Sequence, residues 1–205
     1  MMLSFRPATM QDASALVALV NRAYRPTPGQ EGWTHESNWI TAQRISLEQL
    51  QNLLQQPSNY LLIAECLPLE KHNPQIVGCV LLSWHSPVLQ IGLLTVEPHY
   101  QAQHIGRQLL DYAEQQGRQL FQPDIFEMSV VHTRQELIAY YERRGYQQTG
   151  QIKPYPLDQN VGTPRQPLHL LIMQKLPKPC NKKPCMDSRA MRVSQAGKNQ
   201  SRASC

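Results

Sequence analysis

The stretch TVEPHYQAQHIGRQLLDYAEQQGR, residues 95–118, contains three segments that differ in their pattern of apolar and polar residues. Its start continues an apolar, strand-like run that Pro98 ends, because proline cannot donate a hydrogen bond to a β-ladder. Its end carries Ile105, Leu109 and Ala113 on one helical face, since residues three and four apart share a face. The polar turn QAQHIG between them has almost no large apolar side chain. A strand, a bare turn and a helix are therefore predicted.

A turn without large side chains at the start of a helix is suited to binding an anion. The first N–H groups of a helix lack intrahelical partners and lie at the positive end of its dipole. Slim residues ahead of them let an anion approach, and Gly106 allows a close approach within the first turn. The turn therefore predicts a phosphate or pyrophosphate site, with a plain connection as the alternative. It is neither a Walker A loop nor a dinucleotide fingerprint, because it lacks Gly-Lys-Ser/Thr and has one glycine instead of three.

Length and composition indicate a globular protein. The chain has 205 residues, of which 41% are hydrophobic and 17% charged, and no apolar run is long enough for a membrane span. Its start resembles no signal peptide, because a basic region ahead of a long apolar stretch is missing. The five cysteines are odd in number and irregularly spaced, which fits a reducing compartment better than a disulfide framework. We therefore expect a cytoplasmic protein without membrane contact.

The net charge of +5 resides in the C-terminal tail. Residues 177–205 hold seven of the 20 Lys and Arg residues and one of the 15 acids. The tail has no aromatic residue and no sustained apolar period, so we expect it to be disordered. It is either a solvated extension or a weak contact for RNA and anionic surfaces. The expected working domain, residues 1–176, is close to neutral, which argues against specific nucleic-acid binding.

The domain alternates strand-like and helix-like segments without internal repeats. Strands are expected at 3–8, 60–65, 75–84, 88–98, 125–131, 145–152 and 167–176, and helices at 13–24, 34–43, 47–54, 105–120 and 134–144. Capping boxes are expected at Thr9 with Asp12, Ser46 with Gln49 and Thr133 with Glu136, and a C-cap at Gly145. The element order is therefore β, an α-rich part, βββ, α, β, α, ββ.

Two of these segments resemble motifs of a known family. VEPHYQAQHIGRQLL, residues 96–110, resembles motif A of the GNAT superfamily of N-acetyltransferases, V-x-P-x-Y-[QR]-x-x-G-x-[GA]. ELIAYYERRGYQQTG, residues 136–150, resembles motif B, whose core is Y-E-x-x-G-F. The resemblance covers residue 3 to about 176. It implies the α/β (α+β) GNAT acyl-CoA N-acyltransferase fold, with a central mixed, mostly antiparallel sheet flanked by helices.

The resemblance implies acetyl-CoA as the donor and needs no metal. It assigns the pantetheine arm to the backbone at the strand end, at Leu94, Thr95 and Val96. It assigns the pyrophosphate to the amides of the turn, at Gln103, His104, Ile105, Gly106 and Arg107. Gln101, which stands at the Gln/Arg of the motif, and Ala102 are further cofactor-binding candidates. His104 replaces the first motif glycine. Its side chain points away from the phosphates or contacts them as an imidazolium, which would weaken CoA affinity or make it depend on pH. Arg134 touches the CoA phosphates or merely covers a helix start.

Acyl transfer to an amine must expel a thiolate, which a nearby proton donor stabilises. Tyr141 occupies the motif-B tyrosine, and its alternative role is packing with Leu137; its neighbour Tyr140 is expected to be structural. The amine must be neutral to attack, so a base is useful. Glu97 is the first candidate and Glu127 the second, although either can be an ordinary surface carboxylate. His99, His104 and His132 lack the pattern of a metal site.

The acceptor site is the least defined part. The resemblance assigns it to the first helices and the loop before the last strand, where Trp33, Glu36 and Tyr155 are candidate substrate-binding residues; core packing is the alternative for Trp33. The segments GWTHES and AYYERRGYQQTG resemble little-characterised bacterial members that act on small molecules. We therefore expect acetyl transfer to a small primary amine. A protein N-terminus or lysine as acceptor, and a weak CoA-binding regulatory module, remain alternatives, as do a monomer and a homodimer.

Overall fold

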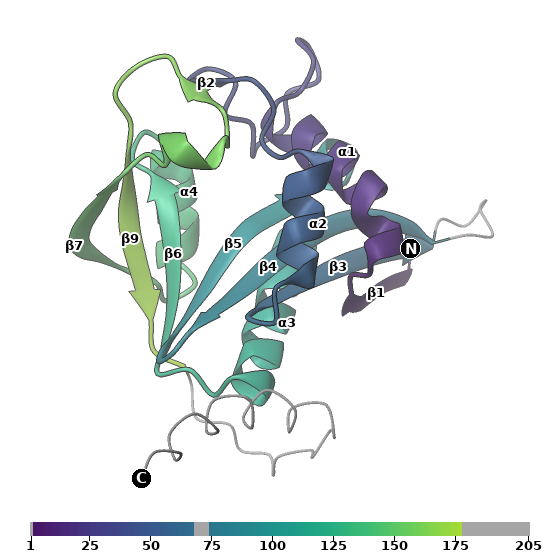
Figure 1. Ribbon diagram of the computed structural model, residues 1–205, viewed down its shortest axis with the longest axis vertical. Helices are drawn as coiled ribbons and strands as arrows, with labels where there is room; N and C mark the ends of the chain where they lie inside the picture. The colour runs from purple at the N-terminus through teal and green to yellow at the C-terminus, as the bar shows by residue number, and fades with distance from the viewer. Residues whose placement is uncertain (1, 68–73, 178–205) are drawn as a thin grey trace, which may run out of the picture.

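The structure is a computed structural model that describes residues 2–67 and 74–177 (Figure 1). The predicted basic tail, apart from its first residue, lies outside the described residues. No helix in the described part of the chain is long and apolar enough to cross a membrane.

A seven-stranded sheet forms the centre of the molecule. Across the sheet, the strands run in the order β1 (Met2–Pro7), β3 (Asn59–Leu67), β4 (Gln75–His85), β5 (Val88–Val96), β6 (Ile125–Val131), β9 (His169–Lys175) and β7 (Gln147–Pro154). All neighbouring strands are antiparallel except β5 and β6, which are parallel. The predicted mixed, mostly antiparallel sheet is confirmed.

Helices cover both faces of this sheet (Figure 1). The helices α1 (Ala13–Tyr24) and α2 (Leu47–Gln55) pack on one face, over Cys79 and Leu93. The helices α3 (Ile105–Leu120) and α4 (Gln135–Glu142) pack on the other face. Alternate strand residues point to opposite faces, so the sheet separates two apolar clusters that together form the core.

Local signals in the sequence explain where several elements begin and end. The Ser46 hydroxyl accepts the N–H of Gln49, and the Gln49 side chain accepts the N–H of Ser46, which is the predicted capping box of α2. Asp12 likewise accepts the N–H of Thr9, the cap residue of the short 3₁₀ turn η1 (Met10–Asp12) that precedes α1. Gly145 follows α4 with φ of 86°, as predicted for a C-cap glycine.

Two predicted elements are wrong. Residues 34–43 form turns and the short strand β2 (Ile40–Thr41), because this segment pairs with β8 (Thr163–Pro164). The capping box of Thr133 with Glu136 does not form. Within the described residues, the Thr133 hydroxyl is buried without a hydrogen-bond partner, and the Glu136 carboxylate accepts a hydrogen bond from Arg134 instead of from the N–H of Thr133.

The strands β5 and β6 diverge, and this opening positions the site. They pair only between residues 88–90 and residues 125–127 and then separate toward the top of the view (Figure 1). Two further 3₁₀ turns border the opening, η2 (Pro98–Tyr100) and η3 (Leu157–Gln159). Within β5, Leu93 and Leu94 together lie opposite Val80, and Leu93 has φ of 51°. Such a β-bulge changes the direction of the backbone, here at the edge that faces the opening.

Candidate active site

A cavity of about 1440 Å³ occupies the opening between β5 and β6. It brings together most residues that the sequence singled out, from both sides of the sheet. Those lining it are Trp33, Glu36, Leu94, Val96, Gln101, Ala102, His104, Ile105, Gly106, Arg107, Glu127, Arg134, Tyr141 and Tyr155. Thr95, Glu97 and Gln103 do not line the cavity. Thr95 is fully buried, and its hydroxyl donates to the carbonyl of Leu93 at 2.9 Å.

The start of α3 is as bare as the sequence predicted. Ala102 and His104 have φ of 60° and 61°, in the left-handed region, and the helix has no side-chain cap. Backbone N–H groups in such a turn converge on a concave point that suits an anion. The left-handed conformation also explains why the motif has glycine at the place of His104. The side chain of His104 is exposed, which leaves the helix start accessible.

Gly106 lies close to two other residues that line the cavity, Val96 and Tyr140. A Cβ atom at this position would lie 3.4 Å from Cγ2 of Val96 and 3.6 Å from the hydroxyl oxygen of Tyr140. A methyl group therefore fits, whereas a larger side chain would fill the space above the helix start. Tyr140, expected to be structural, also lines the cavity. Its ring lies between Trp33, with ring centroids 5.3 Å apart, and the guanidinium of Arg144, 3.3 Å from the ring centroid.

Residues 32–35, here called the strap, lie beside the wide end of the opening. Gln101 holds the strap from the β5 side: its amide oxygen accepts the N–H of Trp33 at 2.5 Å, and its amide nitrogen donates to the Thr34 hydroxyl at 3.2 Å. The same nitrogen donates to the carbonyl of Val96 at 3.0 Å. A Cβ atom on Gly32 would lie 2.9 Å from the Gln101 amide. The Gln101 side chain therefore faces the strap.

Arg134 holds the strap from the β6 side. Its guanidinium donates to the carbonyls of Trp33 at 2.8 Å and of Thr34 and His35 at 3.2 Å, and its Nε donates to Glu136. The residue is only 1% exposed. An arginine has five N–H groups, and most of these are used here. This geometry does not support the predicted contact with CoA phosphates.

Tyr141 presents a buried phenol to the cavity. It is 7% exposed and packs edge-on against Tyr140 and Tyr146. Burial and the neighbouring Tyr24 raise the pKa of Tyr141 far above its usual range. Burial also raises the pKa of Tyr24 to about 12. Both hydroxyls therefore keep their protons at neutral pH and can donate hydrogen bonds.

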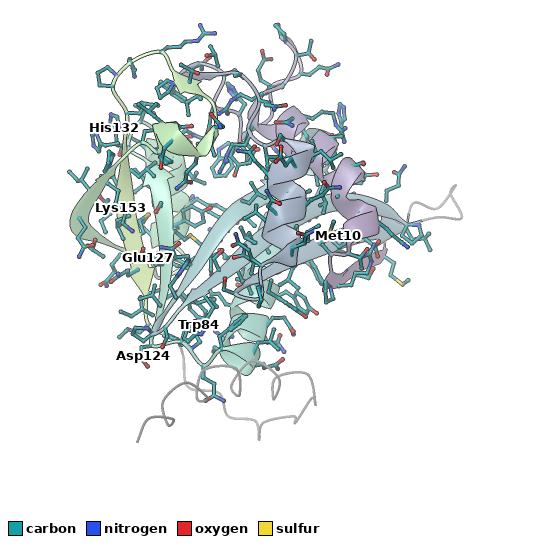
Figure 2. The ribbon with its side chains drawn as sticks, viewed as in Figure 1. Met10, Trp84, Asp124, Glu127, His132 and Lys153 are labelled. Atoms are coloured by element: carbon teal, nitrogen blue, oxygen red, sulfur yellow. The ribbon has the colours of Figure 1, made fainter. Side chains whose placement is uncertain are left out.

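The two candidate bases have different surroundings. Glu97 pairs with Arg22 at 2.7 Å outside the cavity. Glu127 lines the cavity at the narrow end of the opening and accepts hydrogen bonds from Gln174 at 2.9 Å and Lys153 at 3.2 Å (Figure 2). Burial opposes ionisation of Glu127, but these hydrogen bonds outweigh it and lower the pKa below the usual glutamate value. A carboxylate with a lowered pKa is a weak base.

The predicted acceptor residues line the cavity, but two of them already have partners. Glu36 is 8% exposed and pairs with Arg25 at 3.0 Å. The hydroxyl of Tyr155 donates to the carbonyl of Val161 at 2.9 Å. Trp33 is 44% exposed, so it is not a core residue. Among the described residues, no group of three or more His, Cys, Asp and Glu side chains could hold a metal ion.

Sequence reasoning missed several residues of the cavity, among them Tyr24 and Arg44. The hydroxyl of Tyr24 lies 3.4 Å from the carbonyl oxygen of Leu94, at the bulge of β5. The guanidinium carbon of Arg44 lies 5.5 Å from the centre of the Tyr24 ring. Tyr24 resembled one more residue of the apolar stripe of α1, and Arg44 belongs to no local pattern. Only the tertiary fold brings them to the site.

The fold is shared with several solved N-acetyltransferases, all at low identity. The ribosomal-protein-S18-alanine N-acetyltransferase of Escherichia coli is 16% identical, with a TM-score of 0.61, and the match covers 88% of this chain and 97% of that one. The PaiA N-acetyltransferase of Thermoplasma acidophilum, in complex with coenzyme A, is 15% identical, with a TM-score of 0.62 and coverage of 86% and 99%. A spermidine N-acetyltransferase chimera from Vibrio cholerae and hSSAT is 14% identical, with a TM-score of 0.59 and coverage of 86% and 96%.

At these identities, the structural matches establish the fold alone. A search of curated proteins found no match. The sequence itself, however, matches the model of the acetyltransferase (GNAT) family over residues 16–146, which is more than half of the chain. This range includes motif A, residues 136–146 of motif B, the diverging strands and the cavity residues between Tyr24 and Arg144. The chain therefore belongs to the acetyltransferase (GNAT) family.

Proposed function

We propose that this protein transfers the acetyl group of acetyl-CoA to the primary amine of a small molecule. The observation that carries the proposal is the cavity in which the free edge of β5, the bare start of α3 and the buried phenol of Tyr141 meet. These three features supply what acetyl transfer needs: a backbone edge for an extended arm, a site for a pyrophosphate and a proton donor.

The donor side of the cavity fits acetyl-CoA. The left-handed turn at His104 and the clearance above Gly106 suit a pyrophosphate at the backbone N–H groups of residues 104–107. Beyond Gln90, no strand of the described residues pairs with the β6-facing edge of β5, so the pantetheine amides can pair with Leu94 and Val96. When bound, acetyl-CoA supplies the thioester that an amine can attack.

The chemistry requires one bond to form and one to break. The neutral amine nitrogen attacks the thioester carbonyl carbon, and the tetrahedral centre then collapses with loss of the C–S bond. The phenol of Tyr141 gives its proton to the departing sulfur and regains one from the nitrogen, which becomes acidic after attack. Because burial raises its pKa, the phenol carries its proton before the reaction starts. The products are an N-acetyl amide and the CoA thiol.

The strap supports a small acceptor. Gln101 and Arg134 anchor it from opposite sides of the opening, and this limits the room for a folded protein partner at that end. The structural neighbours do not decide the question, because one is described as acting on a ribosomal protein alanine and another on spermidine. A peptide N-terminus or lysine and a regulatory CoA-binding role are therefore outcomes of the test.

The test is acetyl transfer from acetyl-CoA to a panel of free primary amines and to peptides with free N-termini or lysines, with thiol release as the readout. We expect turnover with at least one free amine and none with the peptides. Turnover confined to peptides would contradict a small acceptor. Binding of acetyl-CoA without turnover of any amine would favour a regulatory role.

A further inference from the structure

The charged side chains on the acceptor side of the cavity are mostly neutralised by partners. Glu36 pairs with Arg25 at 3.0 Å, and Glu127 pairs with Lys153 at 3.2 Å (Figure 2). Figure 2 shows Glu127 on β6 and Lys153 on β7, away from α2. These pairs offer an incoming molecule little net charge. A charge without a partner on the same side is therefore the feature most able to select an acceptor.

Arg44 is such a charge. It lines the cavity ahead of α2, and no carboxylate of the described residues lies within salt-bridge distance of its guanidinium. Its guanidinium carbon lies 5.5 Å from the centre of the Tyr24 ring. The backbone beneath it is fixed, because the Asn21 side chain accepts the N–H of Arg44 at 2.7 Å and donates to the carbonyl of Ile45 at 2.9 Å. The backbone of Arg44 is therefore fixed, and its guanidinium lies beside the Tyr24 ring without a carboxylate partner among the described residues.

Arg44 is connected through Tyr24 to the bulge of β5, where the proposed reaction takes place. Tyr24 contacts Arg44 through its ring, and its hydroxyl lies 3.4 Å from the carbonyl oxygen of Leu94 at the bulge of β5. The guanidinium and the bulge are thus two neighbours of one tyrosine side chain. A molecule that spans them needs a group for the guanidinium and, a few bonds away, a nitrogen at the bulge.

We propose that the acceptor is a carboxylate-bearing amine of the α-amino acid class, and that Arg44 binds its carboxylate. The planar guanidinium fork matches a carboxylate with two parallel hydrogen bonds. This contact would direct the amine toward Leu94 and the hydroxyl of Tyr24. The inference rests on the proposed function, because it names the acceptor of the same site.

Other charges that line the cavity give the alternative. Glu31 and Asp158 are exposed, and they would favour a cationic acceptor such as a diamine. Arg107 and Arg144 line the cavity from α3 and the end of α4, on the donor side, where phosphates are expected. The Arg44 guanidinium therefore remains the unpaired cation next to the bulge on the acceptor side, within the part of the chain that the structure describes.

The experiment uses matched sets of three probes: an α-amino acid, its carboxamide, and the amine with hydrogen in place of the carboxylate. Sets built on alanine, methionine, phenylalanine and glutamate sample different side chains. Binding to the protein saturated with CoA is measured by calorimetry, and acetyl transfer is measured in parallel. The variants are Arg44→Gln, Arg44→Lys and the control Arg165→Gln, which removes an exposed arginine that does not line the cavity.

We expect at least one amino acid to bind more tightly than its carboxamide and its decarboxylated amine. Arg44→Gln should weaken that binding by about 10- to 100-fold and leave the other two probes unchanged. Arg44→Lys should keep part of the preference, and Arg165→Gln should keep all of it. Acetyl-CoA affinity should stay the same in each variant, which shows that the fold is intact.

Three outcomes separate this inference from the proposed function. Equal binding of all probes, a preference for the decarboxylated amines, or binding of none of the amino acids would overturn the inference. Acetyl transfer to decarboxylated amines would in that case still uphold the proposed function. Binding of amino acids that depends on Arg44, without acetyl transfer, would support the inference and contradict the proposed function.

Discussion

The donor and acceptor sides of the cavity are built in different ways. Residues 94–107, one continuous strand, turn and helix start, supply most of the donor side. The acceptor side combines Tyr24, Arg44, Glu127 and Tyr155 from distant parts of the chain. A local motif can specify the first side by itself, whereas the second exists only after the sheet has formed. This difference explains why the family of the chain is easier to recognise than its acceptor.

Two arginines illustrate the same difference. Arg134 lies beside a motif and was expected to bind phosphate, but its donors are used by the carbonyls of the strap. Arg44 lies in no motif, yet its guanidinium faces the cavity without a carboxylate partner among the described residues. Position in a motif therefore says less about the role of an arginine than its remaining hydrogen-bond capacity does.

The largest effect is expected from a substitution that blocks the donor side of the cavity. Gly106→Trp should weaken acetyl-CoA binding by about 100-fold or more, because the indole would occupy the space above the helix start. Gly106→Ala is the matched control, since a methyl group meets only ordinary contacts at 3.4 Å and 3.6 Å. Calorimetric titration measures both. Unchanged affinity in Gly106→Trp would show that the donor does not bind at this turn.

The next largest effect is expected at Tyr141, whose phenol serves both the donor and the acceptor side of the cavity. Tyr141→Phe should lower kcat by about 100-fold, with little change in acetyl-CoA affinity, because the proton donor is lost while the ring stays. Tyr112→Phe serves as control, since Tyr112 stacks on Phe5 away from the cavity. Steady-state kinetics with an active amine measure the change. Full activity of the Tyr141→Phe variant would show that Tyr141 serves only in packing.

Substitution of Arg134 distinguishes between two roles of this residue, an anchor of the strap and a phosphate ligand. Arg134→Ala should lower the free energy of unfolding by about 3 kcal/mol, because buried carbonyls of the strap lose their donors. Arg134→Lys should lose less. Thermal unfolding measures the stability and calorimetry the acetyl-CoA affinity, which we expect to persist in the folded variant. A tenfold loss of affinity at unchanged stability would instead support a phosphate contact.

His104→Gly should have a smaller effect. Glycine adopts the left-handed conformation without the steric cost of about 1 kcal/mol that His104 bears, so the melting temperature should rise slightly. Acetyl-CoA affinity should change little at pH values on either side of the usual histidine pKa. A fall in affinity confined to the lower pH would show that a charged His104 holds phosphate.

The smallest effect tests the acceptor side through pH. The folded-state pKa of Glu127 lies below its ordinary value of 4.5, so its ionised form contributes stability above that pH and loses the contribution as pH falls. Glu127→Gln should therefore be less stable than the wild type near neutral pH. The difference should close below about pH 4.5 in denaturant titrations. A difference that persists in acid would show that the contribution of Glu127 to stability does not depend on its ionisation.

The sequence predicted elements with strong local signals and missed those decided by tertiary contacts. The Ser46 capping box, the Gly145 C-cap and the helix after the bare turn all formed as expected. Residues 34–43 did not become a helix, because their pairing with residues 163–164 is not visible in a local pattern. Thr133 and Glu136 fit a capping box, but Arg134 between them takes Glu136.

The same limit applies within the site. Gln101 was singled out from its place in the motif, but the sequence did not show that its side chain binds Trp33 and Thr34. Gly106 was predicted from local geometry and lies where a small residue is needed. The pairing of Glu97 with Arg22, far away in the sequence, could not be foreseen either. Backbone-determined features were predictable, and side-chain partners across the sheet were not.

The most direct test of the account is calorimetric titration of the purified protein with acetyl-CoA at two pH values, one on each side of the usual histidine pKa. The account predicts one site per chain, micromolar affinity and similar values at both pH conditions, since the bare backbone at the start of α3 is accessible and does not titrate. Absence of binding at both pH values would contradict the donor site and, with it, the proposed acetyl transfer.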